Sequence, residues 1–311
     1  MKKLISICLV LLMTFSIVGC TSSAKPTGQD PTNITAKPNQ GDKEDQTDVE
    51  QSPDVTSVPE SKPESVSIEE SILVDESGVK ITVKSLDTEG FWGPALKLLI
   101  ENESGKDLTV QVRNASVNGY MVDTMMSADV AKGKKANETL KFASSDLEQS
   151  GITTIADMEF SFHIFDSESW DTYLDTDKIS IKTTAADNFV YSFDDSGNKV
   201  YDADGIKIVV KGLSADTSIW GPGVIVYIEN ATEKDITIQA RNVSVNGFMV
   251  DPIFSCDVCA GKHAIDTINF MDSDLEENEI TEISDIELSF HVFDSSSWNG
   301  IVDTDAITID F

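Results

Sequence analysis

The feature that most constrains the fold of this chain is an internal duplication. Residues 78–183 align on residues 205–311, with an offset of 127 at first and of 128 from Trp92 and Trp220 onward. The strongest matched blocks are RNASVNG at 113–119 with RNVSVNG at 241–247, and SFHIFDS at 161–167 with SFHVFDS at 289–295. Solenoid repeats are much shorter, roughly 20 to 50 residues, so each copy is expected to form its own domain.

Each copy has the residue pattern of antiparallel β-structure. Val79, Ile81 and Val83 alternate with polar residues, which is the period of a half-buried strand. Asn-Gly at 118–119, and again at 246–247, is typical of a type I′ hairpin turn, which needs two residues with positive φ. We therefore predict an all-β chain with two tandem antiparallel immunoglobulin-like β-sandwich domains, at residues 71–183 and 189–311.

Two smaller elements are predicted beside these strands. Ser145 with Glu148, and Ser273 with Glu276, have the spacing of a capping box, so each domain is expected to carry one short helix. Residues 189–193 and 199–201 flank the turn sequence Asp-Asp-Ser-Gly-Asn. They are expected to form a hairpin that belongs to the second domain.

The N-terminus has the pattern of a processing signal. Lys2 and Lys3 precede an apolar run at 4–18, which is too short to span a bilayer comfortably as a helix. The run ends in Ile-Val-Gly-Cys at 17–20, which resembles the lipobox of bacterial lipoproteins. The resemblance implies cleavage before Cys20 and an anchor of acyl chains such as palmitate on it, so residues 1–20 are interpreted as a lipoprotein signal peptide. An ordinary signal peptide or an uncleaved anchor helix is the alternative.

Residues 21–70 are predicted to be a disordered acidic stalk, rich in Pro, Ser and Thr. They hold six of the nine prolines and no aromatic residue, too little apolar surface to offset the entropy of ordering. The net charge of −31 argues against a nucleic-acid partner, because phosphate binding needs clustered Lys and Arg. Together with Cys20, the stalk predicts that the chain lies outside the cytoplasm, at the cell surface, and is lipid-anchored to the cell membrane.

The lipobox, the acidic stalk and the Asn-x-Ser-Val-Asn-Gly hairpin together resemble a known group of proteins. They look like the extracellular immunoglobulin-like domains of surface lipoproteins in clostridia and related Gram-positive bacteria, in particular the DUF4352-like sandwich family. The resemblance covers nearly all of the chain after Cys20. It implies a β-sandwich fold and a surface location, and it implies no catalytic residue, because its motifs are structural turns.

The three histidines are the only neutral-pH bases of the chain. His163 and His291 occupy the same strand position, where a nearby carboxylate would allow acid–base chemistry; His263 follows a pair of cysteines. We favour hydrogen-bonded histidines on a sheet surface, because the sequence has no Gly-x-Ser-x-Gly elbow, His-Glu-x-x-His motif or phosphate-binding glycine loop. Neither an enzyme nor a bound cofactor is expected.

Cys256 and Cys259 form the one Cys-x-x-Cys of the chain. A disulfide between them is a candidate outside the cytoplasm, but residues three apart on a straight strand point to opposite faces. A metal site is disfavoured because there is no second cysteine pair. The first copy has Ala128 and Ala131 at these places, so the default interpretation is two small buried residues.

Acidic residues that could offer oxygen ligands to Ca²⁺ cluster after each histidine strand, although their spacing does not match an EF-hand loop. They are Asp166, Glu168, Asp171, Asp175 and Asp177 in the first copy, and Asp294, Asn299, Asp303 and Asp305 in the second. The alternative is a pair of solvated acidic loops, and no metal is assigned.

The tryptophans lie at matched places, two in each copy. They are Trp92, Trp170, Trp220 and Trp298. Exposed, they would stack on sugar rings or anchor a protein partner; the alternative is packing in the core or in turns. We take them as the candidate ligand-binding residues.

The sequence therefore predicts a membrane-anchored lipoprotein with two binding or structural modules. The expected partners are the membrane, through the lipid on Cys20, and cell-wall glycan or another surface protein. Two other hypotheses stay open: an envelope enzyme or accessory that acts on polysaccharide, and a Ca²⁺-stabilised adhesion module.

Overall fold

The structure is a computed structural model that describes residues 66–90, 92–214 and 221–311. The predicted signal peptide, Cys20, most of the predicted stalk and Trp220 lie outside these residues. The described residues belong to one compact unit, Ser61–Phe311. Within them, no helix has the length and apolar character needed to cross a membrane.

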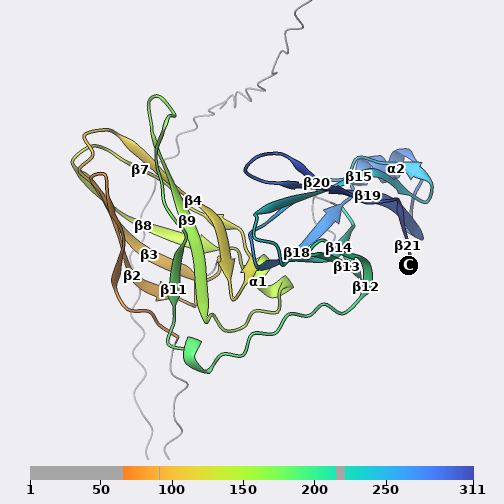
Figure 1. Cartoon of the computed structure of the whole chain (residues 1–311), viewed down its shortest axis with the longest axis horizontal. Helices are drawn as coiled ribbons and strands as arrows, with labels where there is room; N and C mark the ends of the chain where they lie inside the picture. The colour runs from red at the N-terminus through yellow and green to blue at the C-terminus, as the bar shows by residue number, and fades with distance from the viewer. Residues whose placement is uncertain (1–65, 91, 215–220) are drawn as a thin grey trace, which may run out of the picture. The chain divides into compact units, whose positions relative to one another are not determined.

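The first repeat folds into two antiparallel sheets (Figure 1). One sheet has the strand order β1 (Ser71–Glu76), β2 (Val79–Asp87), β3 (Ala95–Asn102), β8 (Lys134–Phe142) and β6 (Thr124–Met125). The other is built on β4 (Leu108–Val117) and β9 (Asp157–Asp166), which pair with each other along most of their length. Strands β5 (Tyr120–Met121) and β7 (Ser127–Val130) pair with β4, and strands β10 (Thr172–Asp175) and β11 (Ile179–Lys182) pair with β9.

The second repeat has the same arrangement. One sheet has the order β12 (Asn198–Ala203), β13 (Ile206–Leu213), β14 (Gly223–Asn230) and β18 (Lys262–Asn269). The other is built on β15 (Ile236–Val245) and β19 (Asp285–Asp294), to which β16 (Phe248–Met249), β17 (Ser255–Val258), β20 (Gly300–Asp303) and β21 (Ile307–Asp310) are added. The described α-helices are α1 (Ser144–Gln149) and α2 (Asp272–Glu277), one in each repeat.

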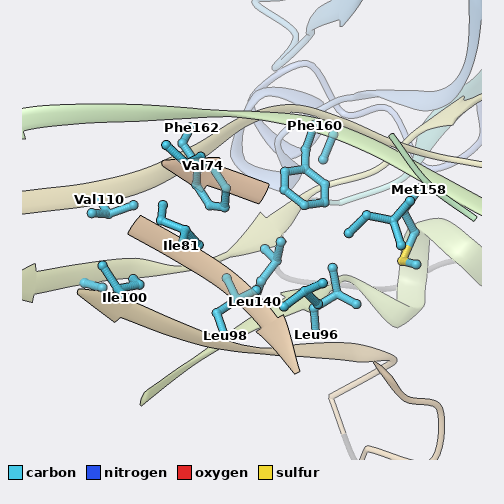
Figure 2. Close-up of a cluster of buried hydrophobic side chains, with 14 of the residues drawn as sticks. Val74, Ile81, Leu96, Leu98, Ile100, Val110, Leu140, Met158, Phe160 and Phe162 are labelled. Carbon is cyan, nitrogen blue, oxygen red and sulfur yellow. The ribbon is translucent and has the colours of Figure 1, made fainter. Parts of the chain in front are cut away.

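Strand alternation explains how each pair of sheets closes on a core. In β9, Phe160, Phe162 and Ile164 are fully buried, while Ser161 and His163 between them are half-buried on the other face. Figure 2 shows Phe160 and Phe162 facing Leu98 and other aliphatic side chains of the opposite sheet. The second repeat has an equivalent core, formed by buried residues between Ile206 and Ile309. The predicted pair of β-sandwiches, each with one short helix, is confirmed.

The predicted hairpin turns are confirmed as well. Asn118 and Gly119 have φ values of 50° and 84°, and Asn246 and Gly247 have 51° and 81°. The flanking pair Val117 and Tyr120 closes the first turn. Asparagine does more than accept a positive φ: the Asn118 side chain accepts hydrogen bonds from the backbone N–H of Ala156 and donates one to a carbonyl of the same loop.

The capping-box prediction is wrong. The helices begin at Ser144 and Asp272, after Ala143 and Met271, so Ser145 and Ser273 lie inside the first turn and no side chain caps either helix. Before α1, the Ala143 N–H instead donates to the carbonyl of Asp123 as strand β8 ends.

The predicted hairpin at 189–201 is also wrong in its first arm. Strand β12 is present and pairs with β13, but residues 189–197 form no strand. Their aromatic side chains are used elsewhere, as the contacts of Phe193 show below.

Candidate functional site

The same loop follows the histidine strand in both repeats, and it displays a tryptophan. After β9, Trp170 N–H donates to the carbonyl of Asp166 and Asp166 N–H donates to the carbonyl of Asp171, which closes a short loop before β10. Trp170 has φ 63°, and Trp298 in the matching loop has φ 60°. Such left-handed positions usually carry glycine or asparagine, so a bulky ring at this place is unusual, and it occurs twice.

Each of these tryptophans completes a ladder of three rings on the outer face of the sandwich. Trp170 stacks on Phe165 at a centroid distance of 5.4 Å and an interplanar angle of 18°, and the His163 ring contacts Phe165 at 5.4 Å and 35°. In the second repeat Trp298 stacks on Phe293 at 5.5 Å and 16°. We call the sets His163–Phe165–Trp170 and His291–Phe293–Trp298 the Trp170 platform and the Trp298 platform.

The outer ring of each platform faces solvent. Trp170 is 75% exposed and Trp298 is 76% exposed, whereas Phe165 and Phe293 beneath them are 5% exposed. The tryptophan therefore shields one aromatic ring and presents its own free face. The predicted alternatives, exposure or packing, are both realised in part: one face of each ring packs and the other is open.

Hydrogen bonds hold the base of each platform. The Nδ1 atom of His163 lies 2.5 Å from a carboxylate oxygen of Asp175, and Nδ1 of His291 lies 2.6 Å from Asp303. The histidines are thus hydrogen-bonded on the sheet surface, as the sequence interpretation favoured, with a carboxylate on the neighbouring strand. Because one nitrogen is engaged, each ring is held in a fixed orientation against its phenylalanine.

A carboxylate fixes each loop. Asp166 accepts hydrogen bonds from the N–H groups of Glu168 and Ser169, and Lys106 Nζ lies 2.8 Å from its other oxygen. The Lys106 ammonium, followed by these two N–H groups, holds the pKa of Asp166 below its usual range. In the second repeat the N–H of Ser297 and the ammonium of Lys234 lower the pKa of Asp294 to about 2. Both carboxylates are therefore charged, and each is bound by N–H groups of its own loop and by one lysine.

The acidic residues of the two loops are the candidate calcium ligands. No group of three or more His, Cys, Asp or Glu side chains in the part of the chain that the structure describes has the arrangement needed to hold a metal ion. Two of the candidate ligands already have partners, since Asp166 bonds to Lys106 and Asp175 to His163. Asp166 and Asp175 thereby hold the loop and the histidine of the Trp170 platform.

The other candidate residues lie apart from the platforms. Trp92 is 60% exposed in the turn before β3. Cys256 is buried in β17 and Cys259 is half-buried after that strand; both are unbonded thiols. Burial raises the pKa of the Cys256 thiol and raises that of Cys259 to about 12, so both stay protonated at neutral pH.

His263 lies where the two repeats meet, in a contact that we call the seam. Its backbone N–H donates to the carbonyl of Gly119 at 2.9 Å, and strand β18 pairs there with β5 in parallel. The Phe193 ring stacks on the imidazole with a centroid distance of 3.6 Å. Tyr120 is 4% exposed, and it forms a third apolar cluster with Val209 and other residues around the histidine.

Polar contacts flank the seam. Lys262 Nζ lies 2.5 Å from a carboxylate oxygen of Glu159, and Gln149 donates to the hydroxyl of Thr267. Burial raises the pKa of Glu159, but the ammonium groups of Lys262 and Lys178 outweigh it and hold the pKa below its usual value. Beside these contacts is a cavity of about 410 Å³ with both repeats in its lining. Its acidic lining residues are Asp123, Asp146, Asp257 and Asp266.

The sequence interpretation anticipated the tryptophans but missed the rings beneath them and the seam. Phe165 was assigned no role, although a phenylalanine on the polar face of a strand is a signal that something covers it. The sequence also held a signal for the seam. The second copy has an aromatic ring at two positions where the first copy has none: Tyr227 replaces Leu99, and His263 replaces Lys135.

Comparisons with known proteins add no family. No protein-family model matches the chain, and no curated protein matches it. Among solved structures the chain is similar to the crystal structure of the YadV chaperone, with 9% identity over 70% of this chain and 92% of that chain. The TM-score of 0.22 is too low for that likeness to carry an argument.

Proposed function

We propose that this chain is a lipid-anchored surface protein that binds extracellular glycan through its two tryptophan platforms. The observation that carries the proposal is the duplicated exposed ring. Two copies that differ at about half of their positions both keep an unusual backbone conformation that turns a tryptophan face to solvent. Single exposed rings are common on protein surfaces, but a left-handed backbone kept at a bulky residue in both copies is not, so the two rings are expected to have a ligand.

The surroundings of the rings favour a sugar over a protein partner. A protein interface needs a fully buried apolar core of several residues. The neighbours of Trp170 are instead polar and exposed: Glu168, Ser169 and Asp171 in its own loop. A pyranose ring packs its C–H face on an aromatic ring while its hydroxyl groups bond to carboxylates and hydroxyls at the rim. A single open ring with a polar rim suits that chemistry.

The surface location rests on the N-terminus, which lies outside the described residues. The run Ile-Val-Gly-Cys at 17–20 after an apolar segment resembles a lipobox, and the acidic sequence that follows suits a tether. On the same resemblance, the two sandwiches are proposed to belong with the DUF4352-like domains of Gram-positive surface lipoproteins.

Removing the ring faces tests glycan binding. Trp170→Ala and Trp298→Ala are each expected to weaken the binding of soluble cell-wall glycan fragments by about tenfold, and the double variant to abolish it, because each ring supplies the stacking surface of one site. Titration calorimetry on residues 61–311 measures this. Trp92→Ala is the matched control and is expected to keep the wild-type affinity.

Two results would count against the glycan proposal. The double variant could bind glycan as tightly as the wild type, which would remove the platforms from the function. Alternatively, the wild type could bind no glycan while a surface protein is captured by it and not by the double variant. That second result would replace the glycan by a protein partner at the same rings.

The anchor has its own test. Cys20→Ser is expected to release the protein from the membrane fraction into the medium or to leave it as an unprocessed precursor, and to abolish labelling by a palmitate analogue, because the thiol is the acceptor of the acyl group. Fractionation with in-gel detection of the label measures both. Persistent labelling of the Cys20→Ser protein would contradict the assignment, and Cys259→Ser is the matched control.

A further inference from the structure

The hairpin that docks at the seam has a close counterpart in the second repeat, with Phe248 in place of Tyr120, that docks on no other part of the described chain. In the first repeat Tyr120 is 4% exposed and Met121 is half-buried. At the same positions of the second repeat, Phe248 is 48% exposed and Met249 is 67% exposed. The same apolar tip is thus covered in one copy and open in the other. We call the turn and strand at 246–249 the Phe248 hairpin.

The seam shows what such a hairpin docks on. The tip of the first-repeat hairpin lies against strand β18, where Gly119 accepts a hydrogen bond from His263 N–H. Beside it, the carboxylate of Glu159 in β9 meets the ammonium of Lys262 at the start of β18. The docking surface is therefore an apolar tip with one carboxylate, and its target is a strand edge with one lysine.

Both parts of this arrangement occur a second time. Glu287 in β19 is the counterpart of Glu159; it is exposed and lies in the same sheet as the Phe248 hairpin. Lys134 at the start of β8 is the counterpart of Lys262 and is exposed. Among the residues that the structure describes, neither side chain has an ion-pair partner. Thr139 matches Thr267, and Glu277 matches Gln149. The second pair therefore still offers a hydroxyl group and a hydrogen-bond acceptor.

Strand β8 also has a free edge in the right place. It pairs with β3 on one side, and on the other side β6 pairs only with its last residues, Lys141 and Phe142. Over the rest of β8, no described strand pairs with that side. In the second repeat, the matching edge of β18 is the one that pairs with β5 of the first repeat.

We propose that the Phe248 hairpin docks on the free edge of strand β8 in a second copy of this chain. Gly247 accepts a hydrogen bond from Lys135 N–H, and Glu287 pairs with Lys134, as their counterparts do in the seam. Charge supports this choice: Lys132 and Lys134 lie close together at the β8 edge, beside a Lys135 that pairs with Glu101, and the docking surface has Glu287 and Asp285 on its strand.

The contact joins two different surfaces, so it does not close on itself as a pair. Each copy presents one hairpin and one free edge, and successive copies add head to tail. The target surface is less apolar than its counterpart, with Asn137 in place of Ile265 and Thr82 in place of Val209. The contact between copies is therefore expected to be weaker than the seam, and to suit proteins that are concentrated on one surface.

Sedimentation of residues 61–311, which contain every residue of the three apolar clusters, tests the proposal. The wild type is expected to associate reversibly into species larger than a dimer as its concentration rises. Phe248→Ser is expected to abolish this association while leaving the melting temperature unchanged, because the side chain is exposed in a single copy. Ile72→Ser, which removes another exposed apolar side chain, is the matched control and is expected to associate as the wild type does.

A charge exchange identifies the target edge. Lys134→Glu and Glu287→Lys are each expected to weaken association by about fivefold or more, because each places like charges together. The double variant restores opposite charges between copies and is expected to recover wild-type association. A wild type that stays monomeric at about 1 mM, or a double variant that associates no better than the single ones, overturns the proposal. So does an association that stops at a dimer.

Discussion

At the scale of single residues, His263 illustrates how one substitution between the copies changes the role of a position. Its counterpart Lys135 is exposed, whereas the imidazole is covered by Phe193 and its Nδ1 lies 2.7 Å from the hydroxyl of Tyr227. Burial lowers the pKa of His263 below the usual 6.5; Glu229 opposes this shift, and Lys207 and Lys262 add to it. The neutral ring is the form that the seam stabilises.

The lowered pKa makes stability depend on pH. Above about pH 6.5 the ring is neutral in both the folded and the unfolded chain, and its contribution is constant. As the pH falls from there toward the folded-state pKa, the unfolded chain binds a proton that the folded chain does not, so the free energy of unfolding decreases. Urea unfolding of the wild type and of His263→Phe from pH 7.5 to pH 5.5 measures this loss.

The variant isolates His263 because the other histidines are unchanged in it. His263→Phe is expected to show a smaller loss of stability over this range than the wild type. Asp266 acts in the opposite sense, because burial raises its pKa and folding then favours its protonated form, but this carboxyl is present in both proteins. Equal pH dependence in the two proteins would contradict a buried neutral imidazole.

At the scale of elements, the two Asn-Gly hairpins have nearly the same sequence but different surroundings. Both glycines have left-handed φ values near 80°, which only glycine adopts without strain. A Cβ atom on Gly119 would lie 3.1 Å from the ring of Phe193, whereas one on Gly247 would meet nothing within 4 Å. The turn chemistry is shared, and the difference comes entirely from the seam.

This difference gives a matched pair of substitutions. Gly247→Ala is expected to destabilise the protein by about 1 kcal/mol, because alanine is strained at positive φ. Gly119→Ala is expected to cost more, because the added methyl group also pushes Phe193 from its place on His263. Chemical unfolding of the two variants measures both. Equal losses would mean that Phe193 yields without cost and does not fix the seam.

The same hairpins mark how far the sequence predicts the fold. Alternating residues and Asn-Gly turns are local signals, and they predicted the strands, the turns and the sandwich class. The start of α1 was missed because the residue before it, Ala143, bonds to Asp123, twenty residues away. The strand expected at 189–193 has the right residues, but Phe193 packs on His263, where it is half-buried, rather than in a sheet.

At the scale of the whole molecule, the seam joins two sandwiches that each have their own core. Tyr120, Val209 and Tyr227 are nearly fully buried in a third cluster with residues from both repeats, and Phe193 packs against it. Neither repeat alone covers this cluster, so separation would expose it to water. Comparison of the two copies could have found it, because the first copy has Thr82 and Leu99 where the second has Val209 and Tyr227.

Coupling through this cluster is expected to make the repeats unfold together. Phe193→Ala is expected to weaken the seam by about 1–2 kcal/mol, because the ring is half-buried and a fully buried one contributes about 1.5–3 kcal/mol, and to separate a single calorimetric transition into two. Scanning calorimetry of residues 61–311 measures the number of transitions. Phe189→Ala, an aromatic removed from the same segment away from the seam, is the control and is expected to keep one transition. Two transitions in the wild type would mean that the repeats are independent.

The duplicated platforms have a consequence for how long a ligand stays bound. If each tryptophan holds one sugar unit weakly, a polymer long enough to reach both rings of one chain remains tethered when either unit lets go, and the free ring meets the polymer again at a high effective concentration. Residence time then grows with polymer length, while a short oligosaccharide exchanges quickly. The protein would thereby distinguish an intact wall from its soluble fragments without any difference in the contact at a single ring.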